Sequence, residues 1–465
     1  GTVNSIELSR QHAGRAYVAV HRYRLDDRKP YIFRTDDWGK TWTLLTDGRN
    51  GIPADHWLRV VREDPERPGL LFAGSEFGLY VSFDDGKSWQ PFQLDLPVAP
   101  VADVAVKDGD LAIATHGRSF WVLDDLSVLR QMTPEIAKAS RYLFKPRAAV
   151  RVLNRGGGGA GGGSQAVGQN PPYGATIFYL LPENLTADGK TEVKLEILDP
   201  EGKVIRTLSS QKEEPAAPNP FLRFFPELAR PRKLAAEQGL NRYDWDLQLP
   251  DAFVVQDAVL WGSTDGPRVP PGTYQVRMTL GEWTSTQPLQ VRPDPRKQVA
   301  PEAMAAQYRL AKTAWETLSR THRAIQKVRD VRTQVDGLAK RLKDAGIGDA
   351  GVADAAKALT GKLDAIENAL HQPKSQAGQD ILNFPPQLDD QIANLVGAVA
   401  SAEAAPTRPT EERLAELQSQ LDAKLKELDQ VLATDLPAFE KLVTDKGAPM
   451  VILPKEPAAS GGGAR

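Results

Sequence analysis

The sequence predicts a chain of several domains: a partial β-propeller of about three blades, an immunoglobulin-like β-sandwich and an α-helical bundle. Three observations support this prediction. An eight-residue pattern starts at residue 35 and again at residue 82, 47 residues apart. Short strand-like runs separated by turn residues fill residues 1–125 and 171–293. From residue 294 onward the apolar residues instead recur with helical period.

The composition bounds the class of protein. The chain has 465 residues, a formal net charge of −2 and no cysteine. Disulfides and cysteine-ligated metals are therefore excluded, and we expect neither a metal nor a cofactor. No basic block is present that could neutralise a row of nucleic-acid phosphates, so we expect no nucleic-acid partner. No apolar run approaches the roughly 18 residues that span a bilayer, so no transmembrane segment is expected.

The first residues suggest an internal cut or a processed terminus. The chain starts with Gly1 and continues directly into an alternating run, Val3–Leu8, without a charged and apolar leader. Residues 1–125 then read as a series of strands. The strand-like runs are Ala16–Val20, Tyr31–Arg34, Leu58–Val61, Leu70–Ala73, Gly78–Val81, Val101–Val106, Leu111–Ala114 and Phe120–Leu123.

The repeated pattern has a mechanical interpretation. Its two copies share a hydroxyl residue, an aspartate, a glycine and a tryptophan: Thr35, Asp37, Gly39 and Trp42 in the first, Ser82, Asp84, Gly86 and Trp89 in the second. The aspartate can accept hydrogen bonds from N–H groups of its own turn, the glycine can adopt positive φ, and the tryptophan can pack under the turn. The spacing is that of one four-stranded blade, roughly 40–50 residues.

These motifs resemble the Asp-box, or BNR repeat, of sialidases, sortilin-type receptors and xyloglucanase-like propellers, in which the motif is structural. A third segment, Ala114–Asp125, stands where a blade should end but departs from the pattern. With residues 60–65 and 78–86 it resembles bacterial sortilin-like (VPS10-type) proteins often labelled glycosyl hydrolases. The resemblance implies an extracytoplasmic location, periplasmic, secreted or at the cell surface, and further N-terminal blades outside this sequence.

Residues 126–170 are expected to form a connector with a flexible glycine-rich linker at 156–163, because no Lys-Ser/Thr follows the glycines as a phosphate-binding loop requires. Residues 171–293 are expected to form the sandwich. Its expected strands are Ala175–Leu181, Glu192–Leu198, Val204–Leu208, Tyr243–Leu247, Gly272–Leu280 and Pro288–Val291. The segment Ser209–Glu237, rich in Pro, Arg and Lys, is interpreted as an insertion. Gly239–Asp246 and Val269–Tyr274 resemble the immunoglobulin-like module of flagellar hook-capping proteins and of the C-termini of secreted proteins.

Residues 294–446 are expected to form an antiparallel helical bundle, and residues 447–465 a flexible tail. Pro301 and Pro409 suit first helical turns, and Gly346 with Gly348 suits a helix end. Apolar residues from Met304 to Ile325, and again from Leu414 to Leu432, alternate steps of three and four. A wide apolar stripe on the first helix would allow the bundle to form oligomers.

Chemistry-bearing residues are few. The histidines lack the spacing of a metal site, and His322 is expected to be a core residue. His116 and Arg118 form the most reactive-looking cluster and are candidate binding residues. The favoured interpretation is a blade-end turn in which Arg118 pairs with Asp124 or Asp125. A glycosidase needs two facing carboxylates, and the candidates by residue type are Glu63, Asp64, Glu76 and Asp103. Trp38 and Trp57 can either stack on sugar rings or pack within a blade.

Two functions fit these features. The first is a non-catalytic binding or scaffold protein that presents its propeller to a protein or glycan. The second is a glycoside hydrolase resembling xyloglucanase-type propellers, whose catalytic residues are unknown from this sequence. Since three blades alone would leave open strand edges, we expect as partner the remaining propeller blades, in the same or an associated chain.

Overall fold

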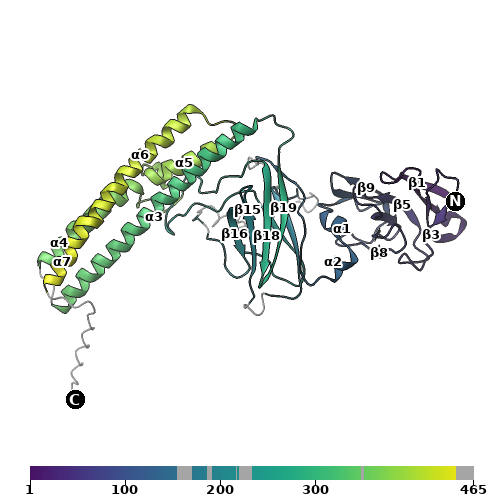
Figure 1. Cartoon of the computed structure of the whole chain (residues 1–465), viewed down its shortest axis with the longest axis horizontal. Helices are drawn as coiled ribbons and strands as arrows, with labels where there is room; N and C mark the ends of the chain where they lie inside the picture. The colour runs from purple at the N-terminus through teal and green to yellow at the C-terminus, as the bar shows by residue number, and fades with distance from the viewer. Residues whose placement is uncertain (154–169, 186–190, 216, 219–232, 347–349, 447–465) are drawn as a thin grey trace, which may run out of the picture.

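The computed structural model describes residues 1–153, 170–185, 191–215, 217–218, 233–346 and 350–446. The chain forms three parts in sequence order (Figure 1): sheets at the N-terminal end, a β-sandwich in the middle and long helices at the other end. The glycine-rich linker and the tail expected from the sequence, and most of the expected insertion, lie outside the described residues.

The N-terminal part consists of three antiparallel sheets in which each strand pairs with the next along the chain. Two sheets have four strands and the third has three. The first contains β1 (Thr2–Leu8), β2 (Ala16–Arg22), β3 (Asp27–Thr35) and β4 (Thr43–Leu44). The second contains β5 (Leu58–Glu63), β6 (Leu71–Ser75), β7 (Leu79–Ser82) and β8 (Gln90–Pro91). The third contains β9 (Val101–Lys107), β10 (Asp110–Thr115) and β11 (Phe120–Leu123).

These sheets pack face to face, as propeller-like blades do. One core joins the first and second sheets, with Tyr17 and Ile32 against Val61 and Leu71. Another joins the second and third sheets, with Phe72 and Val81 among its residues. We call the three sheets the first, second and third blade. The strand-like runs of the sequence overlap these strands, although Leu70 and Gly78 lie just before β6 and β7. The short outer strands β4 and β8 directly follow Trp42 and Trp89, the closing residues of the two motifs.

The segment after the third blade is more ordered than the sequence suggested. Two short helices, α1 (Ser127–Gln131) and α2 (Pro134–Lys138), follow β11 directly. Two short strands, β12 (Tyr142–Leu143) and β13 (Ala149–Arg151), then join the sandwich by pairing with strands far along the chain. The expectation of a plain connector at 126–170 is therefore wrong for its described N-terminal half, whose short strands are fixed by their distant partners.

The sandwich has one sheet of three strands and one of five. The strand orders are β12-β14-β17 and β13-β19-β18-β15-β16. The remaining strands are β14 (Ala175–Leu181), β15 (Val193–Leu198), β16 (Val204–Ser209), β17 (Gly239–Trp245), β18 (Gly272–Leu280) and β19 (Trp283–Pro293). A single core built around Trp245, Tyr179 and Ile177 lies between them. β17 lies N-terminal to its predicted position, and β19 is longer than predicted.

The C-terminal part is helical. Its elements are α3 (Pro301–Ala345), α4 (Ala350–Leu370), the 3-10 turn η4 (Asp380–Leu382), α5 (Leu388–Ala400), α6 (Arg408–Gln430), the π-helical turn η5 (Val431–Asp435) and α7 (Leu436–Asp445). Pro301 and Pro409 lie in first turns and Gly346 caps α3 with positive φ, as the sequence predicted. One core unites the helices. Within the described residues no helix combines the length and apolarity needed to cross a membrane.

The sandwich and the helical part are joined by buried polar contacts. Arg151 on β13 contacts Glu403 at 2.6 Å and the side chain of Gln307 on α3 at 3.2 Å. Trp315 of α3 packs against both the sandwich core and the helical core. The sandwich and the helical part therefore meet in one buried interface.

Candidate functional site

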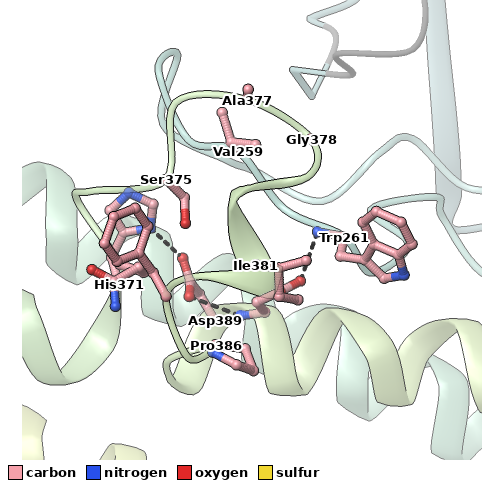
Figure 2. Close-up of a pocket in the computed structure, with 12 residues that line it drawn as sticks. Val259, Trp261, His371, Ser375, Ala377, Gly378, Ile381, Pro386 and Asp389 are labelled. Carbon is pink, nitrogen blue, oxygen red and sulfur yellow. Dashed lines mark hydrogen bonds and ion pairs between the residues drawn. The ribbon is translucent and has the colours of Figure 1, made fainter.

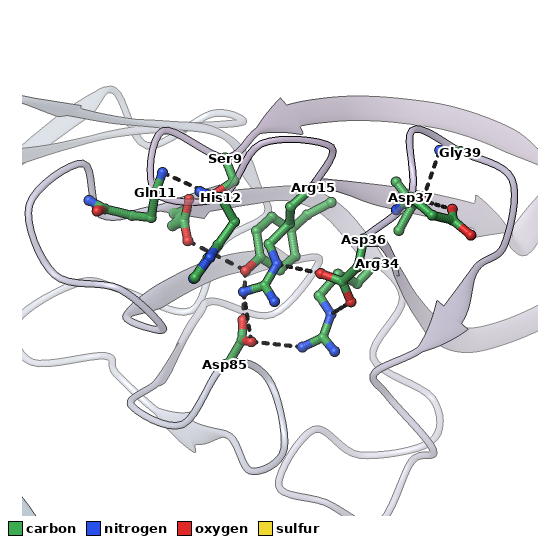
Figure 3. A network of polar contacts seen from close by, with 12 residues as sticks. Ser9, Gln11, His12, Arg15, Arg34, Asp36, Asp37, Gly39 and Asp85 are labelled. Carbon is green, nitrogen blue, oxygen red and sulfur yellow. Dashed lines mark hydrogen bonds and ion pairs between the residues drawn. The ribbon is translucent and has the colours of Figure 1, made fainter.

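The repeated turns use their polar side chains internally. In the first turn the Thr41 N–H donates to Asp37 at 2.8 Å, and the Gly39 N–H donates to Thr35 Oγ1 at 2.9 Å. In the second turn, Ser88 and Asp84 make the matching bond at 2.9 Å, as do Gly86 and Ser82. Figure 3 shows Asp37 folded back onto its own turn. Both aspartates therefore act in local structure, as expected from the sequence.

A cluster of opposite charges joins the first blade to the second turn (Figure 3). Asp85 accepts ion pairs from Arg15 at 3.0 Å and from Arg34 at 2.7 Å. Asp36 bridges the same two arginines, and the Tyr17 hydroxyl donates to Asp85 at 2.6 Å. Two guanidinium groups and two carboxylates balance, so the cluster fixes the packing of the blades. Burial, reinforced by Asp85, raises the pKa of Tyr17, which holds its proton.

Three of the four carboxylates considered for hydrolysis are held in ion pairs, and the fourth is buried. Asp64 is fully buried, contacts Arg130 of α1 at 3.0 Å and accepts two backbone N–H groups. Glu76 pairs with Arg59, and Asp103 pairs with Arg62. Glu63 is buried at the blade interface, 3.5 Å from the Tyr17 hydroxyl.

His116 and Arg118 lie on the exposed turn between β10 and β11. Among the described residues, neither side chain makes a hydrogen bond or ion pair. The predicted pairing of Arg118 with Asp124 or Asp125 is wrong, because those aspartates lie at the opposite end of β11. Asp125 instead accepts the Ser127 N–H, and its own N–H donates to Asp110. Trp57 stacks on Tyr23, with ring centroids 5.5 Å apart, whereas Trp38 is 80% exposed.

A hollow between the third blade and the sandwich gathers charged and aromatic side chains. It holds about 1120 Å³ of space, including its open mouth. The third blade contributes Asp110, Asp124 and Asp125, and the sandwich side contributes residues including Arg147, Tyr173, Thr176, Phe178 and Arg242. Sequence reasoning noted only the two adjacent aspartates, because the other residues come together through the packing of separate domains.

Asp124 is the distinctive group of this hollow. Burial raises the pKa of the Asp124 carboxyl, and repulsion from Asp110 and Asp125 adds to the rise, against the opposing attraction of Arg242 and Arg147. Those arginines already have partners, since Arg147 contacts Asp110 at 2.5 Å and Arg242 contacts Asp244 at 3.0 Å. The exposed Asp124 carboxyl group therefore has hydrogen-bonding capacity, beside the exposed ring of Tyr173.

A second cluster lies in the helical part (Figure 2). His371 contacts Asp389 at 2.6 Å, and the buried His322 ring lies 3.7 Å from the same carboxylate. Asp390 accepts the backbone N–H groups of Trp261 and Gly262, at 2.8 and 2.9 Å. No three His, Cys, Asp or Glu side chains in the described part of the chain are arranged to hold a metal ion. The cluster anchors a sandwich loop to α5, and His322 is buried as predicted.

Comparisons with known proteins leave the family open. No family model matches the chain, and no curated protein matches it. Among solved structures, a GH74 enzyme from Niastella koreensis is similar at 12% identity and a TM-score of 0.23, covering 62% of this chain and 38% of that one. The GH74 xyloglucanase from Xanthomonas campestris gives 13% identity and a TM-score of 0.22, covering 62% of this chain and 47% of that one.

The extracellular domain of a hybrid two-component system from B. thetaiotaomicron gives 9% identity and a TM-score of 0.22, covering 63% of this chain and 31% of that one. This chain thus spans less than half the length of each of these three proteins. At such TM-scores the similarities assign neither an activity nor a substrate. The chain is accordingly identified here by its architecture: three propeller-like blades, a sandwich and a helical part.

Proposed function

We propose that this chain belongs to an extracytoplasmic binding or scaffold protein, in which an Asp-box propeller of the sortilin-like type presents a site for a protein or glycan. In this proposal the sandwich, of immunoglobulin-like type, and the helical part hold that site on a rigid support. The remaining propeller blades are proposed partners, and the helical part is a proposed surface for oligomers.

One observation supports the non-catalytic proposal. Of the four candidate carboxylates, Asp64, Glu76 and Asp103 are held by arginines, and Glu63 is buried between the blades. A glycosidase requires one carboxyl group as acid and a second as base or nucleophile, facing each other across the scissile bond. Carboxylates held in structural ion pairs are poorly suited to either role, because proton transfer would break the contact that positions them.

The hollow at Asp124 is the proposed binding site. Sugar rings and peptides are both bound by aromatic faces combined with a few directed polar groups. Tyr173 and Phe178 supply aromatic surface, and Asp124, Thr176 and Arg242 supply polar groups. Its position between two domains is also where ligand sites commonly occur.

The test uses the full chain and a panel of soluble β-glucans, xyloglucan oligosaccharides and sialosides. We expect binding without hydrolysis for at least one of them, weakened about tenfold or more by Asp124→Asn through loss of a charged hydrogen bond. Asp95→Asn is the matched control, because Asp95 is exposed and outside the hollow. Binding that is unaffected by Asp124→Asn would place the ligand elsewhere.

A glycoside hydrolase of the xyloglucanase type is the alternative. The raised pKa of Asp124 favours it, because a shift toward the protonated form makes a carboxyl group better suited to act as a general acid. Release of reducing ends from xyloglucan, abolished by Asp124→Asn but not by Asp95→Asn, would establish this alternative and refute the non-catalytic proposal.

A further inference from the structure

The first and second blades correspond beyond the repeated turn. Gly14 and Gly69 lie 55 residues apart, and the carbonyl oxygen of each accepts a backbone N–H from a repeated turn. In each turn the donor is the third residue after the hydroxyl residue that opens the motif. The Trp38 N–H donates to the Gly14 carbonyl at 3.0 Å, and the Asp85 N–H donates to the Gly69 carbonyl at 2.9 Å. The same 55-residue step relates β1 to β5 and β2 to β6. Each residue on the open face of the first blade thus has a counterpart on the second.

The counterparts differ sharply in exposure. Val3 is 56% exposed, whereas Leu58 is fully buried, and Ile6 is 63% exposed, whereas Val61 is fully buried. The closing tryptophans follow the same rule. Trp42 is 46% exposed and Trp89 is 3% exposed. The apolar face of the second blade is covered by the first blade, and the matching face of the first blade is uncovered in this chain.

The second blade shows what covers such a face. The loop Leu45–Ile52, which follows β4, crosses the second turn. The Trp89 N–H donates to the Asn50 carbonyl at 2.8 Å, and the Asn50 amide donates to the Lys87 carbonyl at 3.3 Å. Leu45 packs directly on Gly86: a Cβ added at Gly86 would lie 2.8 Å from a methyl group of Leu45.

The first turn has the matching residues, Gly39 and Trp42, but no loop equivalent to Leu45–Ile52 covers them among the described residues. A Cβ at Gly39 would meet only the ring of Trp42. In the described part of the chain, no backbone hydrogen bond outside the strands engages the Trp42 N–H. A groove of about 780 Å³, including its open mouth, lies there instead, and its lining includes Leu8, His12, Gly14, Trp38 and Trp42. Figure 3 shows His12 and Gly39 on either side of the charged cluster beside it.

We propose that this groove docks a further four-stranded blade, which inserts a loop equivalent to Leu45–Ile52. The inserted loop supplies a carbonyl oxygen to the Trp42 N–H and an apolar side chain above Gly39. The sheet behind it covers Val3 and Ile6. This inference rests on the propeller-type assembly proposed above, whereas its test involves neither a ligand nor catalysis, so the two can fail separately.

A second copy of this chain does not fit as the occupant. The third blade is the one whose far face is uncovered, with Phe120 and Val122 exposed. After β11 its chain enters α1 rather than a fourth strand, so it offers no loop equivalent to Leu45–Ile52. The groove therefore requires a complete blade, which the first and second blades of another copy cannot offer, since their corresponding faces are already covered.

Trp38 specifies the chemistry of the docked blade. Its counterpart Asp85 receives Arg15, Arg34 and the Tyr17 hydroxyl from the first blade. An indole in the same place accepts no ion pairs but offers a flat ring for stacking. The docking blade therefore presents an apolar, aromatic or single guanidinium surface to Trp38, in place of the two-arginine cluster.

The test places a second copy of residues 1–55 directly before Gly1, so that the 55-residue register continues and the added blade carries its own Leu45–Ile52 loop. Backbone hydrogen exchange is followed at Trp42 of the original blade. In the unmodified chain we expect rapid exchange at Trp42 and slow exchange at Trp89. In the extended chain we expect exchange at Trp42 to slow by about tenfold or more, because the amide gains a buried acceptor.

Trp38→Asp in the original blade tests the specificity. The added blade presents Arg15, Arg34 and Tyr17, so the aspartate should raise the melting temperature of the extended chain and leave that of the unmodified chain unchanged. Fast exchange at Trp42 in an extended chain whose added strands are themselves protected would overturn the proposal. Protection of Trp42 in the unmodified chain that grows with protein concentration would also overturn it, in favour of a second copy.

If the added blade fails to fold, a synthetic peptide of residues 44–53 replaces it. At millimolar concentration it should slow exchange at Trp42 but not at Trp89, and a Leu45→Ser peptide should have a smaller effect. No slowing by either the peptide or the added blade would refute the docking proposal.

Discussion

At the scale of single residues, the side-chain oxygen atoms of the second repeated turn accept hydrogen bonds from backbone N–H groups of the same turn. Burial alone would raise the pKa of Asp84, but hydrogen bonds from Ser88 and Ser82 outweigh it, so the pKa lies below its ordinary value. A lowered pKa in the folded state means that the stabilisation is present at neutral pH and is lost as pH falls below about 4. The turn is therefore an acid-sensitive element of the blade.

The first prediction concerns this turn. Asp84→Ala removes the acceptor of the Ser88 N–H and hydroxyl, and should cost about 1–2 kcal/mol of unfolding free energy. Urea unfolding monitored by tryptophan fluorescence measures the loss. Asp95→Ala, at an exposed site, should cost less than about 0.5 kcal/mol. Equal losses for the two variants would contradict the structural role.

His322 makes the helical part sensitive to pH in the same direction for a different reason. Burial lowers the pKa of His322, and repulsion from His371 and Arg329 lowers it further. The folded state therefore resists a proton that the unfolded chain accepts below about pH 6.5. Stability is complete above that pH and falls as the solution becomes more acidic, by up to about 1.4 kcal/mol for each pH unit.

The second prediction compares the parent chain with His322→Asn by urea unfolding at pH 7, 6 and 5. We expect the parent to lose stability over this range more steeply than the variant, because asparagine does not titrate. The other titratable groups are common to both proteins, so the difference between the two slopes reports His322 together with its neighbours Asp389 and His371. Parallel slopes would show that the imidazole titrates alike in both states.

Interactions between residues close in the sequence could be predicted at this scale. The bonds of Asp37 and Asp84 lie within four residues of each aspartate, so the sequence contains all the partners. The contacts of Asp85 with Arg15 and Arg34 span 70 and 51 residues, and they depend on how two blades pack. For the same reason the hollow at Asp124 could not be predicted, since Arg242 belongs to another domain.

At the scale of elements, the long helix α3 illustrates how glycine position decides stability. α3 has 45 residues and would extend about 68 Å at 1.5 Å per residue. It ends at Gly346, whose φ of 73° lies in the left-handed region and whose N–H bonds back to Leu342 and Lys343. Gly337, within the helix, has open space where a Cβ would stand.

The third prediction follows from this contrast. Gly346→Ala should destabilise the helical part by about 1 kcal/mol, because alanine is strained at positive φ. Gly337→Ala should stabilise it by about 0.5–1 kcal/mol, because alanine favours a helix interior. Thermal unfolding followed by circular dichroism at 222 nm compares the two. Changes of the same sign would be inconsistent with the cap at Gly346.

Elements were predictable where their own residues define them. Ala175–Leu181 and Gly272–Leu280 are strands with the predicted bounds. The first is a short run of β-branched, aromatic and other apolar residues, and in the second apolar and polar residues alternate. β12 and β13 have two and three residues, too few for any period, and exist because β14 and β19 pair with them. Their assignment therefore required the folded sandwich.

At the scale of the whole molecule, the sandwich and the helical part are coupled through buried charge. Arg151 and Glu403 are both almost fully buried, and Lys297 also contacts Glu403, at 3.0 Å. Removing one member of a buried pair leaves the other without full compensation and costs about 3–5 kcal/mol. These two parts should therefore unfold together in the parent chain.

The fourth prediction is that Arg151→Met lowers this joint transition and separates it into two, as measured by differential scanning calorimetry. Lys297 still neutralises part of the charge on Glu403, so a loss near the lower end, about 3 kcal/mol, is expected. Arg320→Met is the control, because Arg320 and Asp422 form an exposed pair within the helical part. A single unchanged transition in Arg151→Met would show that this contact does not couple the two parts.

The exit of the chain from the third blade has a mechanical consequence. Where a fourth strand would run, the chain forms α1, and Arg130 of α1 is clamped to Asp64 and Glu66 in the hairpin of the second blade. Arg67 of that hairpin also bonds to the Leu129 carbonyl. Tension applied from the sandwich end therefore reaches the second blade first. The three strands of the third blade are therefore protected from separating one after another under force. We expect the contact between α1 and the second blade to bear the load first.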